Sequence, residues 1–309
     1  MDFADGEERT PMSSPDAHLE QPDHVVVEEL QKFSKIRTVR AIHREFANWY
    51  CLVFLLALET YLRVRRQLTW RTRSGTTFVT PPDGSAFPVR EVFLESRYGL
   101  ELLGSAPKLI VDVGANVGVF ALRAAELFPK AEIIAFEPSL PAYAQLVRNL
   151  RANPAITRVD ARRCAVVGPS DVHEVQFWVD STSSTTSTLV ASAVRDHAAG
   201  HWEKVPAVSL SDLLASTGAV DLLKLDVEGA EYEILSETPS SALARVQSIV
   251  LEYHRVEGHS FTDIVRELVV AGFRLERHLH FTDRPGIGWL WFDRDVLRAS
   301  TVSSSQGGA

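Results

Sequence analysis

A glycine-containing turn between two apolar runs constrains the fold of this chain more than any other feature. Residues 109–138 read LIVDVGANVGVFALRAAELFPKAEIIAFEP. The pattern predicts a strand at 109–113, an amphipathic helix at about 117–128, and a second strand at 132–137 that ends in an acidic residue. A strand, a glycine turn, a helix and a second strand in this order are typical of folds that bind a nucleotide-like cofactor.

Strands and helices keep alternating after this unit. We expect a third strand at about 158–167, a fourth at 221–226 and a fifth at 248–254. Repeated βα units require a mostly parallel sheet with helices on both faces. The late segments FRLERHLH and GIGWLWFDR predict an antiparallel hairpin at its edge. The predicted fold class is therefore α/β and Rossmann-like, with ligands expected beyond the carboxyl ends of the strands.

Composition divides the 309 residues into one large domain and several shorter parts. The net charge of −8 is modest and the sequence has no basic stripe, which argues against nucleic-acid binding. The acidic start lacks the basic and apolar regions of a secretory signal, so a cytoplasmic location is expected. The expected division is a disordered acidic tail at 1–23, a helical extension at 24–68, a β-hairpin region packed on the core at 69–95, a cofactor-binding domain at 96–298, and a disordered tail at 299–309.

The segment 48–62 is almost entirely apolar. Its uninterrupted apolar run is shorter than the ~20 residues of a membrane span. We expect a helix that is buried against the main domain or that pairs two copies of the chain, with contact to a membrane surface as the less favoured alternative. Cys51 in this segment and Cys164 both lie among apolar residues, and both are expected to be buried free thiols in a reducing compartment.

The turn DVGANVG at 112–118 has the features of a cofactor-binding loop. Gly114 lets the backbone turn sharply and approach a ligand, and Gly118 lets the helix pack close to the sheet. Glu137, roughly twenty residues further on, is placed to accept hydrogen bonds from ribose hydroxyls. These features fit either a dinucleotide or S-adenosylmethionine.

Asp112 and Asn116 distinguish these two cofactors. A dinucleotide-binding loop typically has glycine where this chain has Asn116, so that bare backbone amides face a pyrophosphate. A carboxylate at Asp112 would repel a pyrophosphate but suits the ammonium group of S-adenosylmethionine, directly or through water. The alternative is that Asp112 only satisfies backbone amides of the turn. The residues therefore favour S-adenosylmethionine.

The chain resembles the FkbM-type S-adenosylmethionine-dependent O-methyltransferases. The resemblance covers about residues 70–295 and implies a seven-stranded methyltransferase sheet. It also implies methyl transfer to a hydroxyl of a small molecule, such as a sugar or a natural-product intermediate of secondary metabolism. The motifs that carry it are VDVGANVG (111–118), FEP (136–138), LSDLL (210–214), LKLDVEGAEYEIL (223–235) and VLEYH (250–254). Position and resemblance together suggest cofactor contacts from Asp112, Gly114, Ala115, Asn116, Gly118, Glu137, Pro138, Cys164, Ala165 and Asp226.

Two other classes of protein remain as alternatives. The first is a methyltransferase-like interaction protein that is tethered to a partner or a membrane through residues 24–66. The second is a dinucleotide-dependent oxidoreductase, against which Asp112 and Asn116 argue.

A hydroxyl acceptor has a high pKa, so a base or a metal near the transferred methyl group would help to remove its proton. The predicted catalytic residues are Asp226, Glu228 and His254. Asp226 closes the apolar strand LLKL and must be paired or near a ligand. Glu252 and His254 point to the same face of the fifth strand. His254 could act as a base or form a buried hydrogen bond with Glu252.

Other charged residues nearby have less specific interpretations. Lys224 shares a face with Asp226 and is a pairing partner or a site residue. Glu231 is sufficiently explained by a favourable position in the first turn of a helix. Tyr98 precedes the first strand and could cover the cofactor or belong to the core. Oxygen-rich sites suit magnesium. However, the candidates Asp226, Glu228, Glu252 and His254 do not have the spacing of a metal motif, so no metal ligand is assigned.

Overall fold

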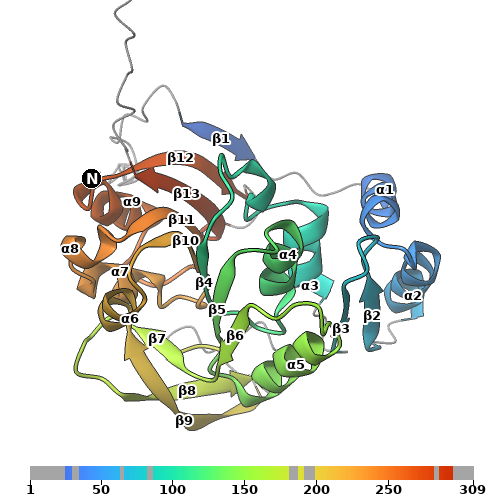
Figure 1. Cartoon of the computed structure of the whole chain (residues 1–309), viewed down its shortest axis with the longest axis horizontal. Coiled ribbons are helices and arrows are strands. Elements are labelled where there is room, and N and C mark those ends of the chain that lie inside the picture. Colours follow the sequence, from blue (N-terminus) through green and yellow to red (C-terminus); the bar gives the residue numbers. More distant parts are fainter. Residues whose placement is uncertain are drawn as a thin grey trace, which may run out of the picture.

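Eight strands form the central sheet, in the order β1-β12-β13-β11-β10-β4-β5-β6 (Figure 1). The structure is a computed structural model that describes residues 25–29, 35–62, 66–81, 86–180, 187–190, 199–281 and 285–294. Neighbouring strands are parallel except where β13 pairs with β11 and β12. The predicted α/β fold with a late antiparallel hairpin is confirmed. The strands are β1 (Val26–Glu29), β4 (Leu109–Val113), β5 (Glu132–Phe136), β6 (Val159–Arg162), β10 (Val220–Leu225), β11 (Val246–Tyr253), β12 (Phe273–His280) and β13 (Gly288–Arg294).

The eighth strand, β1, comes from a segment that we expected to be helical. Val26 pairs with Arg277 of β12 and Glu29 pairs with His280, in parallel register. Consecutive valines favour an extended chain, and β12 offers an open sheet edge for it to pair with. Glu28 adds an ion pair to Arg277 at 3.0 Å. The sheet therefore has one strand more than the seven that the resemblance implied.

The strands divide their side chains between two apolar cores. Ile110 and Leu222 belong to the core that includes α4 and α5, whereas Val111 and Leu223 belong to the core that includes α6, α7 and α9. Helices cover both faces, so the strands are apolar on both sides. The helices are α1 (Lys35–Glu45), α2 (Trp49–Leu62), α3 (Ala86–Val89), α4 (Val119–Leu127), α5 (Leu140–Arg151), α6 (Leu210–Thr217), α7 (Glu231–Glu237), α8 (Ser240–Leu243) and α9 (Phe261–Val270), with a short 3₁₀ turn η2 (Leu100–Leu102).

The strand order reverses between β4 and β10. Along the chain, β5 and β6 follow β4 on one side of it, whereas β10 and β11 lie on the other. The carboxyl ends of these parallel strands meet at one edge of the sheet, where ligands bind in such folds. The residues found there are Gly114, Glu137, Asp226 and His254.

The segment 158–167 is two strands in two sheets rather than one strand. β6 closes the central sheet, whereas β7 (Ala165–Val167) pairs with β9 (Gly200–Ser209) in a three-stranded sheet with β8 (Glu174–Asp180). The chain changes sheets at Arg163 and Cys164. The physical reason is burial. β6 is an edge strand with exposed positions, whereas β7 is fully buried, with Ala165 and Val167 in a small separate core and Val166 in a main core.

Only the first half of the region expected to be a β-hairpin, 69–95, has that structure. β2 (Leu68–Arg71) pairs with β3 (Thr77–Thr80), after which the chain forms α3 and a π-helix, η1 (Arg90–Leu94). The residues Val92, Phe93 and Leu94 of η1 are buried in the core. Their apolar character reflects helical packing against α4 rather than pairing in a sheet.

The apolar segment 48–62 forms α2, which is buried on one side only. Leu52 is fully buried, whereas Tyr50, Phe54 and Tyr61 are exposed. A helix that is apolar all round normally has partners on all sides, but α2 packs mainly on α1 and β2. Within the described ranges, no helix has the length and apolar character needed to cross a membrane.

The expectation of two buried thiols is wrong for Cys51. This residue lies on the exposed side of α2, while Cys164 is half-buried, and both are free thiols. The apolar sequence of α2 predicted that the whole helix is buried, but only one of its faces packs against other elements of the described residues. The predicted disordered tails at 1–23 and 299–309 lie outside the described residues.

Candidate active site

The glycine turn after β4 brings two strand ends into contact. Gly114 has a φ of +79°, and a Cβ atom at this position would lie 1.7 Å from the carbonyl oxygen of Asp226. The backbone N–H groups of Gly114 and Ala115 donate to the carbonyl oxygen of Phe136, at 3.0 and 2.9 Å. Only glycine fits, because the turn passes directly against the chain that leaves β10.

Glu137 follows β5 and directs a buried carboxylate at the turn. Its Oε2 accepts the backbone N–H of Asn116 at 2.7 Å, and its Oε1 accepts that of Ser139 at 2.8 Å. Burial raises the pKa of Glu137 to about 7, although these two hydrogen bonds lower it. Each carboxylate oxygen can accept a second hydrogen bond, so Glu137 retains acceptor capacity for a hydroxyl group.

Asp112 lies within β4 and its carboxylate is fully buried. Nζ of Lys224, in β10, lies 3.1 Å from Oδ1 of Asp112 and 3.4 Å from Oδ2 of Asp226. Nζ also donates to the carbonyl oxygen of Gly114 at 2.7 Å. Burial alone would lower the pKa of Lys224, but the charges of Asp112 and Asp226 outweigh it and raise that pKa. The ammonium group that Asp112 contacts is thus that of Lys224, and a direct contact with a cofactor would require the lysine to move.

A first pocket lies beyond the carboxyl ends of β4, β5 and β10 and encloses about 560 Å³, including its open mouth. It contains most of the predicted cofactor residues. Phe177 of β8 and Leu189 add apolar walls that the sequence did not identify. The predicted residues that line it are Gly114, Asn116, Glu137, Pro138, Cys164, Ala165, Asp226 and Glu228.

Three predicted cofactor residues lie outside this pocket. Asp112 is buried with Lys224, and Ala115 lines a neighbouring pocket. Gly118, with a φ of +86°, packs against α5, where a Cβ atom would lie 2.3 Å from the side chain of Leu146. Gly118 therefore serves the packing role that the sequence suggested for it.

A second pocket, of about 920 Å³ including its mouth, adjoins the first and shares Gly114, Asn116, Asp226 and Glu228 with it. Apolar side chains form part of its walls, and its charged groups come from η1 and from the carboxyl ends of β10 and β11. The remaining lining residues are Phe87, Pro88, Glu91, Val92, Tyr98, Ala115, Phe120, Lys224, Glu252, His254, Phe281 and Ile287.

Tyr98 joins the ends of β10 and β11. Its hydroxyl lies 2.8 Å from Oδ2 of Asp226 and 3.2 Å from Oε2 of Glu252. Burial, reinforced by the charge of Asp226, raises the pKa of Tyr98 well above its usual value, so the hydroxyl keeps its proton and donates. Burial also raises the pKa of Glu252, with contributions from the charges of Glu91 and Asp226. The site therefore holds more carboxylates than its own cations balance.

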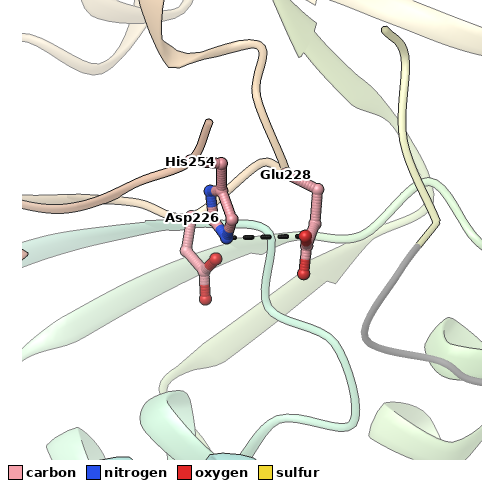
Figure 2. Close-up of side chains that lie close together, drawn as sticks. All are labelled: Asp226, Glu228 and His254. Atoms are coloured by element: carbon pink, nitrogen blue, oxygen red, sulfur yellow. Dashed lines mark ion pairs between the residues drawn. The ribbon is translucent and has the colours of Figure 1, made fainter. Parts of the chain in front are cut away.

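Figure 2 shows the side chains of Asp226, Glu228 and His254 converging on one space. Nε2 of His254 lies 3.4 Å from Oε2 of Glu228, and Nδ1 lies 2.9 Å from Oε1 of Glu231. Burial opposes a charged imidazole, but the charges of Glu228 and Glu231 outweigh it and raise the pKa of His254 well above its usual value. The surrounding carboxylates therefore favour the charged form of the imidazole.

The ligand atoms of Asp226, Glu228 and His254 lie within 4.8 Å of one another, close enough to share a metal ion. The set fits magnesium poorly. Magnesium prefers an octahedron of oxygen ligands, whereas one of these three donors is an imidazole nitrogen. Asp226 is also engaged by Lys224 and Tyr98. We therefore assign no chemical step to a metal at this group.

Sequence reasoning missed a buried charge network beside the second pocket. Arg97 is 1% exposed, lies 2.9 Å from Glu91 and also pairs with Glu95. Its guanidinium carbon lies 4.2 Å from the ring centroid of Trp289. Burial raises the pKa of Glu91 to about 8, although the charge of Arg97 lowers it. The available signal was the occurrence of charged residues within the otherwise apolar run VREVFLESRYG.

Comparison with known proteins assigns the family. The family model for the methyltransferase FkbM domain matches residues 112–275, more than half of the chain. The chain belongs to the FkbM methyltransferase family. It is thus an S-adenosylmethionine-dependent methyltransferase, which confirms the class predicted from the sequence.

Two curated methyltransferases are similar to this chain over more than half of its length. Methyltransferase sdnD of Sordaria araneosa is 32% identical over 191 residues, covering 54% of this chain and 73% of the relative. The 31-O-demethyl-FK506 methyltransferase FkbM of Streptomyces tacrolimicus is 30% identical over 234 residues, covering 66% and 88%. Among solved structures, magnesium protoporphyrin IX methyltransferase from Synechocystis PCC 6803 matches with 14% identity and a TM-score of 0.44, covering 69% of this chain and 83% of that one.

Proposed function

We propose that this methyltransferase acts on a hydroxyl oxygen of a small molecule, such as a sugar or a natural-product intermediate of secondary metabolism. The observation that carries the proposal is the shared border of two pockets. The first pocket contains the glycine turn and Glu137, and the second contains His254 and apolar walls. Asp226 and Glu228 line both. A methyl donor in one pocket and an acceptor in the other would meet at these residues.

Residues of the first pocket suit S-adenosylmethionine. Glu137 would accept hydrogen bonds from the ribose hydroxyls, and the half-buried Cys164 with Ala165 and Phe177 would surround the adenine ring. The excess of carboxylates around Asp226 suits the two positive charges, sulfonium and ammonium, at the other end of the cofactor. The same excess would repel a pyrophosphate.

His254 is the proposed base. S-adenosylmethionine supplies an activated methyl group, so the chain's own task is to position the acceptor and to take the hydroxyl proton. The carboxylates around His254 favour its charged form, so Nε2 must first release its proton to solvent, which a cationic cofactor nearby would favour. Nε2 would then accept the hydroxyl proton as the oxygen forms its bond to the methyl carbon, while the bond from that carbon to the sulfonium sulfur breaks and leaves a neutral thioether. Asp226 and Glu228 would keep the protonated imidazole stable.

Oxygen as the acceptor atom is supported mainly by family resemblance. The name of the Streptomyces tacrolimicus relative, 31-O-demethyl-FK506 methyltransferase, places that protein's methyl transfer on oxygen. The second pocket of this chain adds walls from Phe87, Phe120, Phe281 and Ile287. These side chains suit an acceptor with a substantial apolar surface around its hydroxyl group.

The partner surface that we propose is the exposed side of α2. Tyr50, Phe54 and Tyr61 follow helical spacing and form one apolar stripe. A second copy of the chain is the occupant favoured from sequence, with a membrane surface as the alternative. Size-exclusion chromatography of a Phe54→Ser variant tests the dimer, and liposome flotation tests the membrane surface. If the stripe is an interface, this variant should have a smaller apparent mass or weaker lipid binding than the parent protein.

Calorimetry with S-adenosylmethionine is the first test of the proposed function. We expect a single site, and we expect Glu137→Gln to weaken it by about 10- to 100-fold, the effect of losing hydrogen bonds to a charged group. Glu132→Gln is the matched control, because Glu132 starts the same strand and is exposed. Folded protein that binds no S-adenosylmethionine would contradict the proposal.

The acceptor atom requires a second experiment. An extract of small molecules is incubated with enzyme and a cofactor that carries a deuterated methyl group, and products are analysed by tandem mass spectrometry. We expect the label in an ether that resists acid and base hydrolysis. Label on nitrogen or carbon would disprove oxygen transfer while leaving the methyltransferase class intact.

A further inference from the structure

Glu231, the first residue of α7, has a fully buried carboxylate with three donors around it. The backbone N–H of Val227 donates to its Oε1 at 3.1 Å, and that of Gly229 donates to its Oε2 at 3.0 Å. The third donor is Nδ1 of His254, 2.9 Å from Oε1. A carboxylate accepts only, so the proton of this third contact belongs to Nδ1.

The sequence offered a sufficient structural role for Glu231 at the start of a helix, and the two backbone contacts fit that role. The third contact does not. A favourable interaction with the helix dipole requires a carboxylate near the N-terminal N–H groups of the helix, but it does not require a contact with an imidazole. Moreover, His254 directly follows β11, and the hydrogen bond joins it to the helix that follows the turn carrying Asp226 and Glu228. Glu231 thus fixes both a backbone turn and a side chain of the second pocket.

We propose that Glu231 is a positioning residue that selects the nitrogen of His254 available to the acceptor. With Nδ1–H held by Glu231, the nitrogen that can lose a proton is Nε2. Nε2 is the nitrogen that faces the pocket, 3.4 Å from Glu228 and 3.7 Å from Glu252. Without this contact, a neutral imidazole could carry its proton on either nitrogen, and one tautomer would present N–H instead of a lone pair to the hydroxyl.

This inference rests on the proposed role of His254 as the base, but its geometry can be tested without activity. Nitrogen-15 NMR of histidine-labelled protein reports the tautomer and the titration of each imidazole. The His254 signal is identified by its loss in His254→Gln. In the parent protein we expect the neutral form, at alkaline pH, to keep its proton on Nδ1.

Glu231→Gln is the informative variant, because glutamine retains the shape of the side chain but removes its charge. We expect the His254 titration to move to lower pH and the preference for the Nδ1–H tautomer to weaken. Glu233→Gln is the matched control, since Glu233 is in the same helical turn but exposed, and it should leave both unchanged. A His254 titration and tautomer unaffected by Glu231→Gln in a folded protein would overturn the proposal.

Kinetics supply the second arm. We expect Glu231→Gln to lower kcat by about 10- to 100-fold, as loss of an orienting partner typically does. The pH profile of kcat should shift with the NMR titration, while the cofactor Kd stays within about twofold. Because aspartate keeps the negative charge, Glu231→Asp should restore part of the His254 titration and of its Nδ1–H tautomer preference. A variant with parent-like kcat and an altered tautomer would remove His254 from catalysis, which separates failure of the proposed base from failure of the positioning role.

Discussion

Replacing Lys224 with methionine is the most demanding test of how the cofactor turn is held. Lys224 is 2% exposed, and its ammonium group contacts Asp112, Asp226 and the carbonyl oxygen of Gly114. Methionine has similar length and no charge, so Lys224→Met leaves the carboxylate of Asp112 buried without a counter-charge. Removing one partner of a buried ion pair costs about 3–5 kcal/mol. At roughly 2–4 °C per kcal/mol, the melting temperature should fall by roughly 6–20 °C.

A double-mutant cycle separates the ion pair from the loss of packing. Asp112→Asn alone should cost less than Lys224→Met, because Lys224 keeps Asp226 as a partner. The double variant Lys224→Met/Asp112→Asn should recover part of the loss, since it buries no uncompensated charge. Coupling energies for such contacting pairs are about 0.5–3 kcal/mol.

Denaturant unfolding of the four proteins provides the free energies. A Lys224→Met variant less than about 1 kcal/mol below the parent would refute the reasoning, because loss of a paired buried charge cannot be that small. Strict additivity in the double variant would show instead that Lys224 acts through Asp226 and the Gly114 carbonyl rather than through Asp112. Calorimetry with the cofactor then tells whether the turn keeps its geometry in those variants that remain folded.

Four further predictions concern the pockets. Gly114→Ala should abolish cofactor binding or folding, as judged by calorimetry and circular dichroism, because its Cβ atom would lie 1.7 Å from a backbone oxygen. Burial raises the pKa of Glu137 to about 7, so cofactor affinity should weaken as the pH falls through about 7 and protonation removes the acceptor capacity of this carboxylate. The affinity is measured roughly one pH unit below and above that pKa, and equal values at the two would argue against the ribose contact. His254→Gln should lower kcat by about 10²–10⁴ with little change in cofactor affinity, and should remove the rise in kcat with pH that the raised pKa of His254 predicts for the parent enzyme. Binding of S-adenosylmethionine should release protons, because a cation beside Glu252 and Glu91 lowers their raised pKa values. Calorimetry in buffers of different ionisation enthalpy measures this release, and uptake of protons would contradict the prediction.

Local sequence patterns were sufficient to predict the strand ends that meet at the site. The run LIVDVG predicts a buried strand and its turn without knowledge of any distant residue, and LLKLD does the same for β10. β11 and the hairpin of β12 and β13 were also evident from alternation and turn residues. These elements are regular and apolar, so their own periodicity defines them.

Contacts between distant segments could not be predicted in this way. β1 is a strand only because β12 offers an edge, and η1 is helical because it packs on α4. The ion pair of Arg97 with Glu91 depends on the path of the backbone between these two residues, which their separation in the sequence does not predict. The same holds for Glu231, whose link to His254 spans two elements.

The sequence predicted the right class of cofactor, but the physical reason given for it was incomplete. Asp112 was taken to repel a pyrophosphate, yet Lys224 neutralises it within the core. The carboxylates that line both pockets are those of Asp226 and Glu228, which follow the neighbouring strand β10. They lie beside the same turn because Gly114 brings the two strand ends into backbone contact. The preference for a cationic cofactor is therefore a property of two adjoining strand ends, and the pair of Asp112 with Lys224 serves to hold those ends together.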